Sequence, residues 1–165
     1  MHGEVLSEYK NNKEMFYSGW RAAGIGSLCC VFLLGIIFGY VYVESSTGST
    51  GEYYDYLETF TENEEIATSL YNLLDDGNNL QVVKFIEKTA LPAWRENLQI
   101  IHKISELDDL PPELKVNNEL LVEYCKLRIK SCELISQSVL SGGTQYDLKL
   151  TTIHSRIEVI VDKLQ

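Results

Sequence analysis

Basic residues and proline are both scarce in this chain, and each shortage narrows what the protein can be. The 165 residues include 14 Lys and Arg against 24 Asp and Glu, which gives a formal net charge of −10. Because phosphate binding draws most of its affinity from basic side chains, nucleic acid and anionic lipid surfaces are disfavoured as partners. With only 3 Pro and 45% hydrophobic residues, the composition is typical of a folded chain, long enough for one modest domain.

The sequence also lacks a disulfide framework and an Asn-x-Ser/Thr glycosylation site. Cys125 and Cys132 lie seven residues apart on a predicted helix, about 10.5 Å along its axis, which is too far for a disulfide. We expect both to be buried free thiols, in a bacterial envelope protein rather than a eukaryotic secreted one. Reduction in the cytoplasm would explain free thiols equally well if the membrane topology were inverted.

Residues 22–43 contain no charged side chain. A helix of that length spans about 33 Å, which is enough to cross a bilayer core of about 30 Å. Lys10, Lys13 and Arg21 precede this run, and the next basic residue is Lys84. The positive-inside rule therefore predicts a cytoplasmic segment over 1–21, a transmembrane helix over 22–43 and an extracytoplasmic remainder, in the inner (plasma) membrane.

A cleaved signal peptide is the alternative to a retained anchor. Both the charged segment before the apolar run and the run itself are long for a signal peptide, so we favour the anchor. Within it, Gly35 and Gly39 form a small-xxx-small pair that allows two helices to approach closely. These two residues are candidates for helix association, although glycine is also simply common in membrane helices.

The rest of the chain carries all the net charge and shows helical periodicity throughout. Residues 44–51 have the composition of a flexible linker. After it, residues 52–165 contain four amphipathic segments with apolar residues at spacings of three and four. The first three segments cover about 53–74, 80–107 and 112–141, and Pro92 interrupts the second. Thr144 caps the fourth segment. The apolar seam of this last segment consists of Tyr146, Leu150, Ile153, Ile157, Ile160 and Leu164.

Short connections between four such segments predict an all-α protein, in which one transmembrane helix is followed by an antiparallel, up-down-up-down four-helix bundle. The proline at position 92 predicts a kinked helix or two collinear pieces, because proline cannot donate a backbone hydrogen bond. The glycines after Ser141 predict the end of the third segment.

Two histidines stand four residues before a glutamate, in the pairs His102–Glu106 and His154–Glu158. Helical bundles bind metals between such positions, but di-iron sites use the reverse order, Glu-x-x-His. Exposed helix-stabilising pairs explain the spacing equally well. We predict no metal site and no cofactor.

For nucleophilic catalysis, a Ser, Thr or Cys must lie beside a base. The two outer cysteines fall on an apolar helix face with no histidine adjacent in sequence, so we predict no catalytic residues and no enzyme activity.

Three further residues, Trp94, Arg95 and Asn97, follow the proline at position 92 and are candidates for a surface cleft. The alternative is a tryptophan in the core. Arg128 is a charge on the apolar stripe of the third segment. We expect it at the rim of the bundle, with pairing to an internal acid as the alternative.

The stretches 91–97, 110–111 and 120–131, together with 16–21, resemble a helical region of single-pass membrane proteins of Bacteroidota, some of which are classed as rhomboid-family. The rhomboid pattern of Gly-x-Ser-Gly and a membrane histidine is absent, since Phe16 stands two residues before Ser18 and residues 22–43 contain no His. Proteolysis is therefore not implied. The resemblance implies an envelope protein whose outer helical domain contacts another molecule.

Together these features predict a membrane-anchored, non-enzymatic binding or scaffolding protein that presents an acidic helical bundle. The expected partner is a protein of the membrane or envelope, and self-association is one form of this. The alternative is a signalling or ligand-sensing subunit that acts through its transmembrane helix, although about 21 cytoplasmic residues are too few for an output domain of their own.

Replacing Gly35 and Gly39 with Leu is expected to weaken helix association in the membrane, because the larger side chains keep two helices apart. The outer bundle should stay folded. Crosslinking in native membranes measures the association, and an unchanged crosslinking yield would contradict the assignment.

Overall fold

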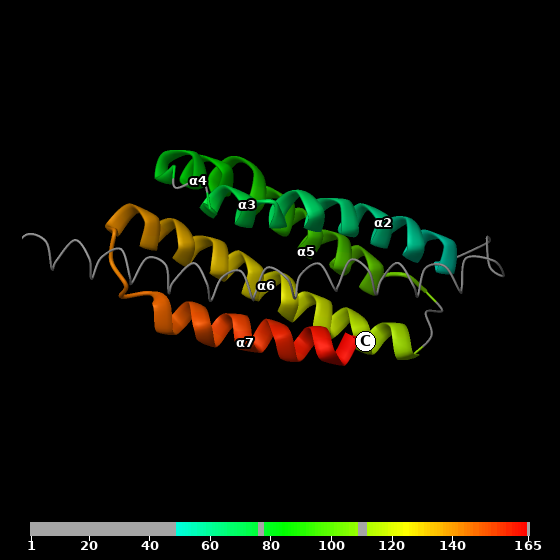
Figure 1. The fold of residues 1–165 in the computed structure, drawn as a ribbon. Helices are drawn as coiled ribbons and strands as arrows, with labels where there is room; N and C mark the ends of the chain where they lie inside the picture. The colour runs from blue at the N-terminus through cyan, green and yellow to red at the C-terminus, as the bar shows by residue number, and fades with distance from the viewer. Residues whose placement is uncertain (1–48, 76–77, 109–111, 165) are drawn as a thin grey trace, which may run out of the picture.

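The computed structural model describes residues 49–75, 78–108 and 112–164, and the regular structure within these ranges is helical (Figure 1). The elements are α2 (Ser49–Thr68), α3 (Leu70–Asp75), α4 (Asn79–Phe85), the π-helix η1 (Ile86–Ala90), α5 (Leu91–Ser105), α6 (Pro112–Ser141) and α7 (Asp147–Leu164). The predicted all-α class and the four-helix packing are confirmed for the residues described.

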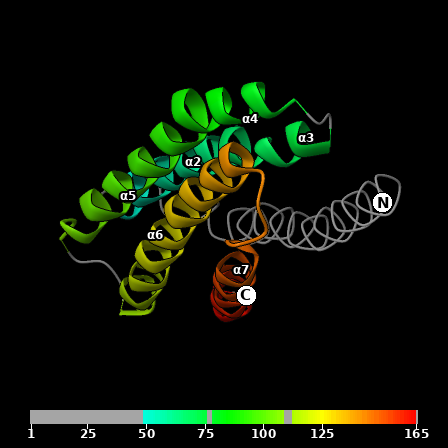
Figure 2. The same cartoon turned by 90° about the vertical axis from the view of Figure 1, so that its left-hand side faces the viewer.

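Four antiparallel runs make up the bundle. The first run is α2 with α3, the second is α4, η1 and α5, and α6 and α7 are the third and fourth (Figure 1). Helix α2 packs on α5, α5 packs on α6, and α6 packs on α7. Figure 2 shows α6 between α5 and α7, so α7 lies at one side of the bundle.

The interruption at Pro92 takes the form of a π-helical turn just before it. Elements α4, η1 and α5 follow one another without a loop, and the N–H of Leu91 donates to the carbonyl of Ile86, five residues earlier. Pro92 then occupies the first turn of α5, where its missing N–H costs nothing. The predicted run is therefore two helical pieces joined by a wide turn.

Two boundaries differ from the prediction. Helix α2 begins at Ser49 and takes in the last three residues of the segment 44–51 that was predicted as linker. Helix α7 begins at Asp147, not directly after Thr144, because the N–H of Asp147 donates to the carbonyl of Thr144 in a turn that precedes the helix. The end of α6 is as predicted, with Gly142 in the left-handed conformation at φ 65°.

The membrane prediction lies outside the described residues, as do the candidate residues Gly35 and Gly39. Within the described ranges, none of the helices combines the length and the apolar character that a membrane crossing requires.

Apolar side chains from all four runs meet in one core. Its largest fully buried members include Trp94, Tyr124 and Phe60. The seam on α7 is confirmed, with Leu150, Ile157 and Ile160 buried and Tyr146, Ile153 and Leu164 packed against them. Cys125 and Cys132 are both buried free thiols, as predicted.

Replacing Cys125 with Ser is expected to lower the free energy of unfolding by about 1 to 3 kcal/mol, because the new hydroxyl would be buried without a hydrogen-bond partner. Chemical denaturation of the full chain in mild detergent measures the change. An unaltered midpoint would contradict the burial of this side chain.

Candidate functional site

The interior of the bundle contains a line of polar side chains between α2, α3, α6 and α7. Glu64 is 0% exposed and Arg128 is 3% exposed, and Ser131 and His154 are also buried. A charge or polar group taken out of water is costly unless it is paired or hydrogen-bonded. We call Glu64, Tyr71, Tyr124, Arg128, Ser131 and His154 the polar network.

Glu64 forms one end of the polar network. It lies on the side of α2 that faces the core, and the hydroxyl of Tyr124 donates to its Oε1. Burial raises the pKa of Glu64, and the Tyr124 hydroxyl and the positive charge of Arg128 only partly offset this effect. Its second oxygen, Oε2, has no hydrogen-bond partner. The environment therefore shifts the protonation equilibrium of Glu64 toward the neutral carboxyl.

Arg128 occupies the centre. Its Nη1 donates to the Tyr71 hydroxyl at 3.0 Å, and its guanidinium carbon lies 5.0 Å from the Tyr124 ring centroid and 5.8 Å from that of Trp94. Burial alone would disfavour the charge, but Tyr124, Tyr71 and Glu64 outweigh it and hold the pKa of Arg128 above its ordinary value. Arg128 thus remains a cation enclosed by aromatic rings.

This position corrects the prediction that Arg128 lies at the rim. The arginine stem has no need to reach water, because two tyrosines and an acid surround the guanidinium inside the bundle. The structure bears out the internal position that the alternative required, but not a direct pairing with an acid. The positive charge of Arg128 lowers the pKa of Glu64, although no ion pair within 4 Å joins the two among the described residues.

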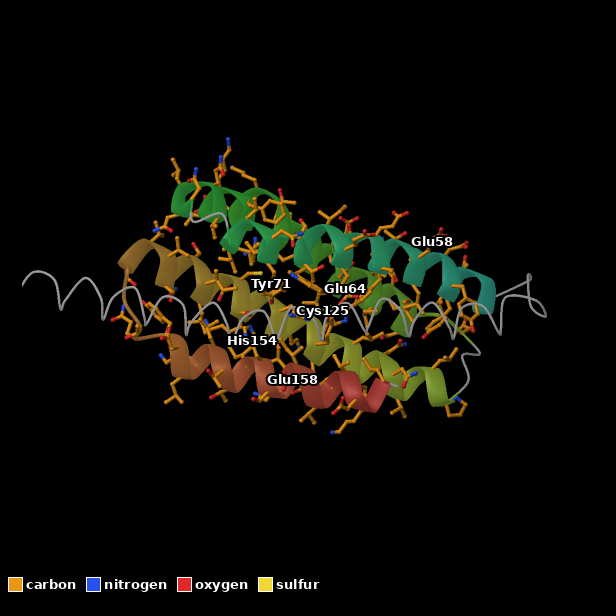
Figure 3. All side chains as sticks on the ribbon, in the orientation of Figure 1. Glu58, Glu64, Tyr71, Cys125, His154 and Glu158 are labelled. Atoms are coloured by element: carbon orange, nitrogen blue, oxygen red, sulfur yellow. The ribbon has the colours of Figure 1, made fainter. Side chains whose placement is uncertain are left out.

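His154 forms the other end. Its Nε2 lies 2.9 Å from the Ser131 hydroxyl, and Ser131 is also hydrogen-bonded to Tyr71. Burial, together with the nearby charge of Arg128, lowers the pKa of His154 to about 4. The imidazole is therefore neutral at physiological pH. Figure 3 shows Glu64 and Tyr71 between the first run and α6, and His154 on the side of α7 that faces α6.

The two cysteines line the same interior. Burial raises the pKa of Cys125, and the neighbouring Glu64 raises it further. Burial likewise raises the pKa of Cys132 to about 12. Nucleophilic cysteines require an accessible thiolate, so these two thiols pack as small apolar groups.

The residues predicted to line a surface cleft separate in the structure. Trp94 and Asn97 are buried, whereas Arg95 is exposed on the outer side of α5. The Trp94 ring meets the Tyr124 ring edge to face at 5.6 Å, and Asn97 donates through Nδ2 to the Phe60 carbonyl at 2.9 Å. The three side chains do not share one surface, and the placement of Trp94 agrees with the alternative of a core tryptophan.

The two predicted His–Glu pairs lie in different environments. His102 and Glu106 are both exposed, while His154 is buried and Glu158 is exposed. In the ranges that the structure describes, no group of three or more His, Cys, Asp or Glu residues lies close enough to bind a metal ion.

Glu64 and Ser131 were not predicted as site residues, and Tyr71 was predicted only as part of an apolar helix face. A signal for Glu64 existed, because it stands four residues after Phe60 and three before Ala67, on the apolar stripe of its helix. An acid at such a position indicates a side chain that faces the core, but it does not identify the residues that contact it.

The arrangement can do two things chemically. It ties α2 and α3 to α6, and α6 to α7, through directional contacts, and it places an acid and a base at the two ends of one chain of hydrogen bonds. Because both end groups are buried, proton binding at either end is coupled to the packing of the helices.

Comparison with protein-family models, with curated proteins and with solved structures finds no match to this chain. The resemblance to Bacteroidota membrane proteins stays a prediction.

The buried carboxyl makes a specific contribution to pH dependence. Because folding raises the pKa of Glu64 above its ordinary 4.5, the folded state keeps this proton where the unfolded state has lost it. Its stabilising contribution is complete below pH 4.5 and is lost as the pH rises through the raised pKa. Glu64→Gln, which stays neutral and still accepts from Tyr124, is expected to remove that loss.

Urea unfolding of the full chain at a series of pH values measures this effect. The matched control is Glu65→Gln, which removes the exposed neighbouring carboxyl. The assignment fails if wild type and Glu64→Gln lose stability equally as the pH rises.

Proposed function

We propose that this chain is a non-enzymatic binding or scaffolding protein of the bacterial envelope. In this proposal residues 22–43 anchor it in the inner membrane, and the acidic bundle stands outside and recruits a protein partner. The observation that carries the proposal is the separation of charge across α2, which places one buried acid on its inner side and all its other acids on its outer side.

The outer side of α2 is an uninterrupted acidic face. It consists of five exposed residues at spacings of three and four, namely Glu52, Asp55, Glu58, Glu62 and Glu65. No Lys or Arg occurs between Val43 and Lys84, so the helix has no basic residue of its own to offset them. Among the described residues the ion pairs are Lys130–Glu133 and Arg156–Glu123, and neither involves this face. Figure 3 shows Glu58 on the side of α2 away from the bundle.

Like charges along one helix face repel one another, and a basic surface docked on them relieves that repulsion. The same charge pattern would steer a basic partner toward α2 before contact. The groups with reactive potential lie in the polar network, away from this face. This division supports recognition of a partner better than turnover of a substrate.

A partner of this kind is a membrane or envelope protein with a basic face. A second copy of the acidic bundle is a poor match for α2, so self-association in this proposal runs through the helix of Gly35 and Gly39. Both forms are compatible with the anchor.

A signalling or sensing subunit is the second candidate, and the tie between α2 and α6 favours it. Only residues 44–48 separate the predicted anchor from α2. Because Glu64 and Tyr71 fasten the first run to α6, a change in bundle packing would act on the helix that leads to the membrane.

The experiment that tests the proposal is crosslinking in native membranes, followed by purification in mild detergent and mass spectrometry. Neutralising the acidic face with Glu52→Gln, Asp55→Asn, Glu58→Gln, Glu62→Gln and Glu65→Gln is expected to reduce partner recovery by about tenfold or more, since each lost charge pair is worth up to about 1 kcal/mol.

The matched control removes five exposed acids that are scattered over the other elements, Glu87, Glu96, Glu106, Glu119 and Glu158. It changes net charge equally and should leave recovery near the wild-type level. Equal loss in both variants would show a general charge effect and count against the α2 face. Recovery of the chain alone from wild-type membranes would favour the sensing alternative.

A further inference from the structure

We propose that the interior of the bundle binds one water molecule, which hydrogen-bonds to Oε2 of Glu64 on α2 and to the Nε–H of Arg128 on α6. The water joins two side chains that do not pair directly. This inference goes beyond the proposed function, and it does not depend on the anchor or on a partner.

Two buried polar atoms define the site. Glu64 is 0% exposed and Arg128 is 3% exposed, and neither Oε2 of the glutamate nor Nε of the arginine has a hydrogen-bond partner among the protein's own groups. Unpaired polar atoms in a core are costly, and buried waters typically make about three hydrogen bonds to groups of this kind. The two atoms therefore offer a binding site to a small molecule that forms hydrogen bonds.

Tyr124 brings the two atoms near each other. Its hydroxyl donates to Oε1 of Glu64, and it is also hydrogen-bonded to the guanidinium of Arg128. The Tyr124 ring centroid lies 5.0 Å from the guanidinium carbon. The two groups that carry an unpaired atom thus contact the same phenol hydroxyl. Figure 3 shows Glu64 between α2 and α6.

The separation of the two side chains suits a bridge rather than a direct pair. Each charge acts on the other, because Arg128 lowers the pKa of Glu64 and Glu64 raises the pKa of Arg128. The described residues nevertheless include no ion pair within 4 Å between them. One water makes two hydrogen bonds of about 2.7 to 3.2 Å each, which is enough to join polar atoms up to about 6 Å apart.

The charges around the site select a neutral ligand. A cation would be repelled by Arg128, and an anion would be repelled whenever Glu64 is ionised. Water accepts from the Nε–H of Arg128, and it donates to Oε2 when Glu64 is ionised or accepts from it when Glu64 is protonated. A water molecule therefore fits both protonation states of the acid.

Proton NMR of the full chain in mild detergent tests the site, with isotope label introduced only at arginine. The chain contains four arginines, so the Nε–H region has few signals, and the signal of Arg128 is assigned through its own side-chain carbons. We expect a cross-relaxation peak between this proton and water, with opposite signs in the laboratory and rotating frames. Opposite signs mark a water that stays bound, whereas surface water gives equal signs.

Glu64→Met, which keeps the length of the side chain but removes the carboxyl, is expected to lose this peak. Glu64→Gln keeps a polar atom at the position of Oε2 and is expected to retain the peak. Glu65→Met is the matched control, because it removes the exposed neighbouring carboxyl, and it should behave like wild type.

These variants also separate a bound water from protons that exchange through the protein. Glu64→Met leaves the Tyr124 hydroxyl in place, so a peak relayed by that hydroxyl would persist in this variant. Glu64→Gln has no carboxyl proton, so a peak relayed by the carboxyl would disappear. Absence of the water peak at Arg128 in wild type would overturn the proposal, and so would an unchanged peak in Glu64→Met or its loss in Glu64→Gln.

If Glu64→Met fails to fold, as judged by circular dichroism, Tyr124→Phe takes its place. A water peak at Arg128 that survives removal of the hydroxyl supports the bound water, and a peak that disappears with the hydroxyl overturns it. None of these readings involves a binding partner, so failure here leaves the proposed recruitment by α2 untouched.

Discussion

The burial of one positive charge, that of Arg128, is the constraint on which the rest of this bundle depends. A guanidinium inside a helical core needs polar and aromatic neighbours on every side, and no single helix can supply them. Here α6 contributes Tyr124, α3 contributes Tyr71 and α5 contributes Trp94, while the buried acid comes from α2. Enclosing this cation therefore constrains which helices are neighbours and at which residues they meet, even though its Nε has no hydrogen-bond partner. A single buried polar group is known to specify register in helical assemblies in a similar manner.

Periodicity predicted the helices because it is a local property. Apolar residues at spacings of three and four, Pro92 and the glycines after Ser141 lie within the segments they describe, and the α7 seam and both buried thiols followed from them. The polar network could not be predicted in this manner. Tyr124 and Glu64 are 60 residues apart in the chain, and Arg128 and Tyr71 are 57 apart. Whether Arg128 reaches the rim or stays inside depends on those distant partners, and the sequence around it looks the same in both cases.

The division between interior and surface shapes how this protein can interact. The titratable side chains of the polar network are buried and contact one another. The acidic residues on the outer side of α2 are exposed and have no basic neighbours on the same helix. A partner would thus meet a field of carboxylates on α2, whereas the buried titratable groups lie away from that surface. Recognition and response to pH would then use different parts of the same small bundle.

The wide turn η1 also sets how tolerant the chain is to changes in length. Buried residues of the second run recur every four positions from Val82 through Ile86 and Ala90 to Trp94, a spacing that would drift around an ordinary α-helix. The π-helical turn absorbs this drift, so that α4 and α5 present one continuous face to the core. Loss of one residue from 86–90 would leave Val82 and Trp94 separated by about three turns of regular α-helix, so that α4 and α5 would still present one face to the core. One residue can therefore be lost from this segment, with the wide turn becoming regular α-helix, without turning a buried face of the second run toward solvent.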